Sequence, residues 1–84
     1  MQTEIREAPK SFTGKGEVRG VEFTQIAKTE KGYIYHRSDG YFEVFRRKVN
    51  QRFNIVSYPG SKSFGDWAWC CRTEEKAHEY LARF

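Results

Sequence analysis

Two cysteines and two histidines are the side chains of this 84-residue sequence that could supply a thiolate nucleophile, an imidazole base or a zinc ligand of these two types. Cys70 and Cys71 are adjacent, and neighbouring side chains of a strand point to opposite faces of a sheet. Zinc sites place their cysteine ligands about two to four residues apart, and adjacent cysteines do not suit a usual disulfide. We therefore expect two reduced thiols, at least one of them buried, and no metal site. Reduced thiols favour a reducing compartment such as the cytoplasm.

Neither histidine predicts an active site. His36 is expected to lie across a hairpin from Glu43, and a histidine oriented by a carboxylate can act as a general base. The sequence predicts no nucleophile and no second acid beside that pair, so a cross-strand structural contact is the simpler interpretation. His78 follows Glu74 by four residues, the spacing of a solvated pair on a helix. We expect no enzymatic activity and no cofactor.

Positive charge is concentrated in the middle of the chain. Residues 31–62 hold seven basic and two acidic side chains, whereas residues 1–30 are neutral and residues 63–84 carry −1, which gives the formal net charge of +4. Basic side chains neutralise phosphates, and aromatic rings stack on bases. We therefore predict a nucleic-acid-binding surface here. Its expected phosphate contacts are Arg37, Arg46, Arg47, Lys48 and Arg52, and its expected stacking residues are Tyr33, Tyr35 and Phe53.

The residues that must position this surface favour a sheet. Seven Phe, five Tyr and two Trp stand against a single Leu, and aromatic residues prefer strands whereas helical bundles draw on Leu and Ala. We expect strands at residues 21–26, 33–37, 41–49, 52–58 and 67–71. Thr73 is expected to cap a helix whose apolar stripe is Ala77, Tyr80, Leu81 and Phe84.

These elements predict one α+β domain: an antiparallel sheet of four to five strands with a C-terminal helix packed on one face. Residues 1–16 contain Pro9, Gly14 and Gly16 and are expected to form a flexible N-terminal arm, and residues 17–84 the domain. No apolar run approaches the about 18 residues that a membrane span needs, and the first residues do not resemble a signal peptide. A cytoplasmic protein without membrane contact is therefore expected.

The pairing of the central strands decides which side chains share a face. If Asp39-Gly40 forms a two-residue turn, Ile34 lies opposite Phe45, and a second two-residue turn at Asn50-Gln51 places Val56 in the same row. That row would lie under the helix, and Tyr33 and Tyr35 would lie on the other face with the cations. A one-residue change in the second turn would swap the faces of the fourth strand, and the Tyr35 face could instead take the helix. One helix cannot cover both apolar faces, so an aromatic surface should stay exposed or be covered by the N-terminal arm.

A three-stranded sheet from about Tyr33 to Val56, followed by a packed helix, resembles in topology the arm-binding domains of phage-type recombinases and plant AP2-type domains. These domains lay their sheet in the major groove of DNA, so the resemblance implies DNA rather than RNA as the partner. It is a likeness of fold, carried by no specific motif.

A second resemblance is carried by the strings Tyr41-Phe42-Glu43-Val44-Phe45-Arg46-Arg47-Lys48, Tyr58-Pro59 and Phe64-Gly65-Asp66-Trp67-Ala68-Trp69. They look like a pattern in small uncharacterised proteins of bacterial phages and mobile elements, which would cover residues 18–84. The family has no established activity, so the resemblance implies a bacterial intracellular role and transfers no site residue.

The alternative to a nucleic-acid partner is a protein partner, which the chain would bind as an interaction module or inhibitor. Trp, Tyr and Arg are enriched at binding hot spots, and the chain is rich in all three. The contacts expected for this alternative are Lys62, Phe64 and Trp67. An exposed sheet edge allows a monomer or a weak dimer.

Overall fold

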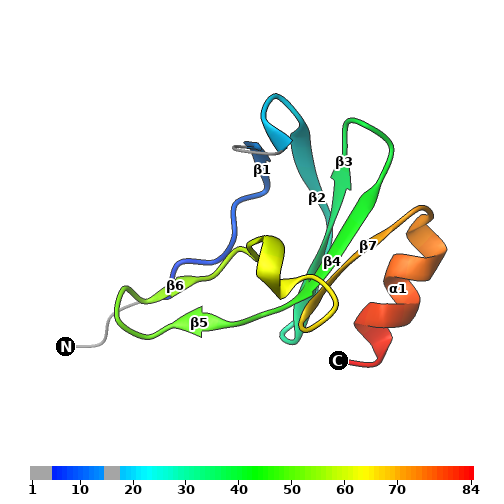
Figure 1. Ribbon diagram of the computed structural model, residues 1–84. Coiled ribbons are helices and arrows are strands. Elements are labelled where there is room, and N and C mark those ends of the chain that lie inside the picture. The colour runs from blue at the N-terminus through cyan, green and yellow to red at the C-terminus, as the bar shows by residue number, and fades with distance from the viewer. Residues whose placement is uncertain (1–4, 15–17) are drawn as a thin grey trace.

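The computed structural model describes residues 5–14 and 18–84, and it confirms an α+β fold (Figure 1). Five antiparallel strands form one sheet in the order β1-β2-β3-β4-β7, and β5 and β6 form a separate two-stranded sheet. The strands are β1 (Ser11–Thr13), β2 (Glu22–Lys28), β3 (Gly32–Arg37), β4 (Phe42–Arg46), β5 (Val49–Asn50), β6 (Ile55–Val56) and β7 (Ala68–Cys71). The helices are the short 3₁₀ helix η2 (Ser61–Ser63) and α1 (Glu74–Ala82).

The turn between β3 and β4 is one residue longer than predicted. The backbone N–H of Arg37 donates to the carbonyl oxygen of Tyr41 at 2.8 Å, so the loop is Ser38-Asp39-Gly40. Gly40 has a φ of 98°, and a glycine in this left-handed region commonly closes a three-residue hairpin loop. The predicted register is therefore wrong by one residue.

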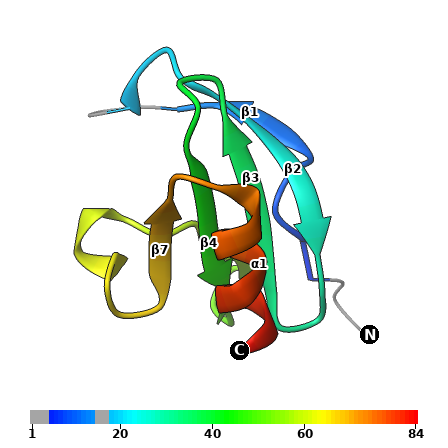
Figure 2. The same ribbon diagram turned by 90° about the vertical axis from the view of Figure 1, so that its right-hand side faces the viewer.

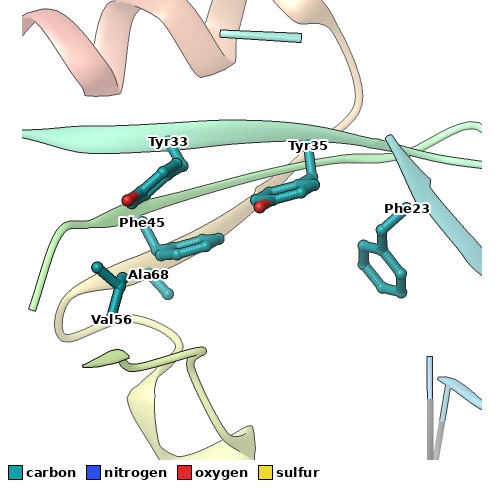
Figure 3. Close-up of a cluster of buried hydrophobic side chains, with 6 residues drawn as sticks. All are labelled: Phe23, Tyr33, Tyr35, Phe45, Val56 and Ala68. Carbon is teal, nitrogen blue, oxygen red and sulfur yellow. The ribbon is translucent and has the colours of Figure 1, made fainter. Parts of the chain in front are cut away.

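The corrected register gives each face of the sheet a different core. Tyr33 pairs with Phe45, Ile34 with Val44, and Tyr35 with Glu43. Figure 3 shows one core, in which Tyr33, Tyr35 and Phe45 lie together with Phe23, Val56 and Ala68. The other core contains Ile34, Val44, Cys71, Ala77 and Leu81. The predicted row of Ile34 and Phe45 under the helix is therefore wrong, because these two side chains lie on opposite faces.

Helix α1 covers the second core, in front of β3, β4 and β7 in Figure 2. Its predicted start is confirmed: the Thr73 hydroxyl accepts a hydrogen bond from the backbone N–H of Lys76 at 3.2 Å, which satisfies one otherwise unpaired donor of the first turn. Ala77 and Leu81 are buried, and the Tyr80 ring stacks on Trp69 with centroids 5.0 Å apart. The predicted apolar stripe is thus the packed face of the helix.

The predicted third and fourth strands are shorter in the structure. The chain leaves the main sheet after β4, and β5 pairs with β6 so that Val49, not Phe45, lies opposite Val56. Residues 51–54 form the loop, in which Asn54 has a positive φ of 52°. The resulting β5–β6 hairpin (residues 48–57) projects from one side of the molecule in Figure 1.

The first described residues cover the aromatic face of the sheet. Strand β1 pairs with β2, and the Phe12 ring stacks on Phe23 with centroids 4.7 Å apart. The Tyr35 hydroxyl donates to the carbonyl oxygen of Pro9 at 2.5 Å, and Arg6 forms an isolated bridge with Ile55 of β6. The second possibility raised by the sequence, that the N-terminal segment covers this face, therefore holds for residues 5–14. The remainder of the predicted arm, residues 1–4, 15 and 16, lies outside the described residues.

Candidate nucleic-acid interface

Arg37, a predicted phosphate contact, is occupied within the fold. Its guanidinium donates to Asp39 Oδ2 at 2.6 Å and to Glu43 Oε2 at 3.0 Å, and 14% of its side chain is exposed. Two carboxylates already neutralise this cation. Arg37 therefore belongs to the folded core and is a poor phosphate ligand.

Arg47 is paired in the same way. Its Nε and Nη2 donate to the two carboxylate oxygens of Glu7 at 2.9 and 2.5 Å, a bidentate geometry that fixes the guanidinium. The Tyr33 hydroxyl also donates to Glu7, and Lys28 Nζ lies 3.7 Å from the same carboxylate. An open depression beside this pair is lined by Glu7, Lys28, Thr29, Glu30 and Arg47. Acidic and basic side chains lie side by side in this depression, so it favours neither an anionic nor a cationic ligand.

The Glu7–Arg47 pair predicts a loss of stability in acid. Hydrogen bonds from Arg47 and Tyr33 lower the pKa of Glu7 from 4.5 to about 2. The folded pKa lies below the unfolded one, so this contribution is present above pH 4.5 and is lost as the pH falls toward 2. Because the pair is partly exposed, we expect Glu7→Gln to lower the free energy of unfolding by about 1 kcal/mol at neutral pH. Urea unfolding of both proteins across this range should show the difference shrinking in acid; a constant difference would contradict the assignment.

Arg46, Lys48 and Arg52 are exposed in the structure, and each lies over an aromatic ring. The Arg46 guanidinium lies 4.7 Å from the ring centroid of Phe84, the Lys48 ammonium 4.9 Å from Trp67, and the Arg52 guanidinium 5.4 Å from Phe53. A ring face attracts a cation without neutralising it. These three predicted phosphate contacts therefore keep their charge at the surface.

Of the three predicted stacking residues, one is accessible. Tyr33 and Tyr35 have no exposed surface, whereas Phe53 is 66% exposed. The observed register places both tyrosines on the same face as Phe45, and residues 5–14 and the chain around Tyr58 cover that face. Their rings cannot stack on a base in this structure. The sheet is therefore not an open platform of the kind that the AP2-type likeness implied.

Residues around the hairpin that the sequence analysis did not single out extend this surface. Ile5 is 42% exposed and Ile55 37% exposed, and Gln51 is exposed in the loop. Arg6, the residue after Ile5, forms a bridge with Ile55, which places this part of the chain beside β6. Ile55 lies on the face that the strand pattern grouped with Phe53, whereas the place of Ile5 beside the hairpin depends on a contact between segments far apart in sequence and could not be predicted.

The residues expected for the protein-binding alternative differ in how exposed they are. Lys62 is exposed, but Phe64 and Trp67 are partly buried and pack against the aromatic core. Lys62 is therefore the most accessible of the three.

No family model matches this chain, and no curated protein or solved structure matches it either. The resemblance to proteins of phages and mobile elements stays a prediction. Among the described residues, no helix has the length and hydropathy of a membrane span.

The two histidines and the two cysteines lie in β3, β7 and α1, outside the β5–β6 hairpin. His36 lies opposite Phe42, not Glu43, so the predicted pair is wrong, whereas His78 does contact Glu74 at 3.2 Å. Cys71 is buried and Cys70 exposed, and burial raises the pKa of both thiols, which lowers the thiolate fraction at neutral pH. Across residues 5–14 and 18–84, no three His, Cys, Asp or Glu side chains gather as metal ligands would.

Proposed function

We propose that this protein binds nucleic acid through the β5–β6 hairpin and its base. The observation that carries the proposal is the charge of this region: residues 44–65 contain five basic and no acidic side chains. Arg47 is paired with Glu7, while Arg46, Lys48, Arg52 and Lys62 are exposed. A projecting element that carries basic and no acidic side chains suits the negative phosphate backbone.

The aromatic rings beside the cations support the same proposal. A ring under a guanidinium or ammonium group restricts the side chain, so less conformational entropy is lost when a phosphate binds. Phe53 adds an exposed ring at the loop, which can pack against a base or sugar. Arg46, Lys48 and Arg52 are the proposed phosphate contacts, with Phe53 as the apolar contact.

Charge reversal tests this proposal. We expect Lys48→Glu combined with Arg52→Glu to weaken binding to a short labelled duplex DNA by about 100-fold at low salt, since two phosphate contacts become repulsive. The matched control is Arg72→Glu with Lys76→Glu, which makes the same change in net charge at exposed positions at and just before the start of α1, on the other side of the molecule from the hairpin (Figure 1).

Fluorescence anisotropy at several salt concentrations measures both the affinity and its salt dependence. The wild type and the control pair should bind in a salt-dependent manner, and the hairpin pair should show a smaller salt slope. Equal losses for the two pairs would mean that net charge, not the hairpin, determines binding. No binding of the wild type to duplex or single-stranded probes would reject the proposal.

A protein partner is the second candidate, and the exposed apolar residues around the hairpin favour it. Phe53, Ile55 and Ile5 are 66%, 37% and 42% exposed, and exposed apolar surface is a feature of interaction sites. This candidate predicts binding that resists salt and is lost in Phe53→Ser, whereas Lys48→Glu leaves most of the affinity. The salt dependence of binding separates the two candidates.

A further inference from the structure

The loop of the β5–β6 hairpin contains residues with a structural role and residues without one. The Asn50 side chain accepts a hydrogen bond from the backbone N–H of Arg52 at 3.0 Å, and Asn54 adopts a positive φ of 52°. Asparagine suits both tasks, because its side chain forms local turns and it tolerates the left-handed region. Gln51, Arg52 and Phe53 lie exposed between them. The turn does not require these three side chains, so they are available to contact a ligand.

We infer that the nucleic acid is duplex DNA and that the β5–β6 hairpin enters its major groove, where Gln51 and Arg52 contact base edges. This inference rests on the proposed function and assigns its ligand. It refines the role of Arg52 from a phosphate contact to a base contact, and leaves Arg46 and Lys48 as contacts to phosphate.

The shape of the hairpin supports the major groove of DNA. The groove of B-form DNA is about 12 Å wide and admits a two-stranded ribbon. Double-stranded RNA has a deep and narrow major groove that side chains cannot read. In the described part of the chain, β5 and β6 form such a ribbon, which projects from the main sheet (Figure 1). Arg6 is hydrogen-bonded along the β6 edge as far as Asn54, so the end of the ribbon that can enter the groove is the loop with Gln51, Arg52 and Phe53.

A single strand fits this surface less well. Proteins that bind single strands stack successive bases on several aromatic side chains. The two aromatic residues predicted for that purpose, Tyr33 and Tyr35, are fully buried, and Phe53 is the exposed ring of the loop. One ring provides one contact and not a platform.

The three exposed loop residues match the chemistry of base edges. Arginine pairs through two hydrogen bonds with guanine, glutamine with adenine, and an apolar side chain such as phenylalanine contacts the thymine methyl group. The contact of Arg52 with Phe53 is through the ring face, which leaves the guanidinium N–H groups to donate to a base. Lys48 and Arg46 precede β5 and lie where the hairpin meets the main sheet, so they can position it through phosphates.

The test selects bound sequences from a pool of duplex DNA with a randomised central segment. The wild type should enrich a short motif that contains guanine. Arg52→Lys keeps the charge and loses the two-pronged donor geometry, so it should lose the preference for that guanine by about 10-fold or more while its binding to unselected DNA changes little. Gln51→Ala should relax the preference at a different base.

The outcomes separate this inference from the proposed function. The selected sequence is also prepared as duplex RNA and as a single strand, and the wild type should bind both more weakly than duplex DNA. Salt-dependent binding without an enriched motif, equal binding of the RNA duplex, or an unchanged motif with Arg52→Lys would each overturn the inference and leave the proposed function standing. A wild type that binds none of the probes would reject both.

Discussion

Replacing Glu43 with alanine is expected to lower the free energy of unfolding by about 3–5 kcal/mol, the usual cost of removing one partner of a buried ion pair. Glu43 is 3% exposed, and it is the one charged residue among the buried side chains of the described chain. Arg37, whose side chain is 14% exposed, donates to Glu43 Oε2 at 3.0 Å. The substitution leaves this guanidinium with Asp39 as its one remaining carboxylate partner in the described chain.

The same carboxylate holds the base of the hairpin. The Tyr58 hydroxyl donates to Glu43 Oε1, and Tyr58 follows β6 on the way back to the main sheet. The Tyr58 ring also packs against Phe45 and Phe12, with centroids 5.4 and 5.1 Å apart. Glu43 therefore connects β4 to the chain that carries the hairpin, and its loss should loosen this connection.

The pH dependence at Glu43 is opposite to that at Glu7. Burial raises the pKa of Glu43 above its ordinary 4.5, although hydrogen bonds from Tyr58 and Arg37 oppose the rise. A carboxyl whose folded pKa is raised stabilises the fold below its unfolded pKa, and this contribution is lost as the pH rises through the folded value. Glu43→Gln removes the ionisation and should abolish this part of the pH profile.

Urea unfolding followed by circular dichroism measures these effects. Tyr58→Phe, which removes one hydrogen bond, should cost about 1–3 kcal/mol. Glu74→Ala serves as the control, because Glu74 is exposed and its pair with His78 on one helix face should contribute about 0.5 kcal/mol at most. A Glu43→Ala variant as stable as Glu74→Ala would show that the buried carboxylate does not hold the fold.

Local patterns in the sequence predicted the fold well. The Thr73 cap and the stripe through Leu81 depend on residues within one helix, and β7 on a run of five residues between two breaks. Such signals need no knowledge of distant contacts. The α+β class followed from them and from the scarcity of leucine.

The β3–β4 register could not be predicted in the same way. Asp39-Gly40 suits a two-residue turn by composition, but Ser38 is held from outside the hairpin: its N–H donates to the Glu22 carbonyl oxygen at 2.8 Å, and its hydroxyl accepts from the Glu22 N–H at 3.0 Å. Arg37 also binds Asp39 across the loop. The hydrogen bonds between Ser38 and β2 and the ion pair within the loop favour the longer loop, and the turn sequence alone does not predict them.

In the candidate site, too, some features follow from the local sequence and others depend on distant contacts. The basic character of the hairpin and the exposed Phe53 follow from the local sequence. The pairing of Arg47 with Glu7, 40 residues away, does not, and it removes one cation from the surface. The burial of Tyr33 and Tyr35 depends on residues 5–14 and Tyr58, which are distant in sequence and cover their face of the sheet, so local patterns could not predict it.

Tyr35→Ala tests whether the Tyr35 face of the sheet is covered or open. In the structure this side chain is fully buried, and its ring stacks on Phe45 with centroids 5.7 Å apart. We expect the substitution to lower the free energy of unfolding by about 3–5 kcal/mol, as large-to-small changes of buried aromatic residues do. If Tyr35 instead lay with the cations on an open face, as the sequence first predicted, the same change would cost little stability and would weaken binding.

Two neighbouring variants make the result specific. Tyr35→Phe keeps the ring and loses the hydroxyl contacts with the Pro9 carbonyl oxygen and Gln25 Nε2, so it should cost about 1 kcal/mol. His36→Ala changes the exposed next residue of β3 and should alter stability by about 0.5 kcal/mol. A stable Tyr35→Ala protein with impaired binding would show that the Tyr35 face is open and is the interface. A destabilised one, with binding by its folded fraction intact, would leave the hairpin as the surface that meets the nucleic acid.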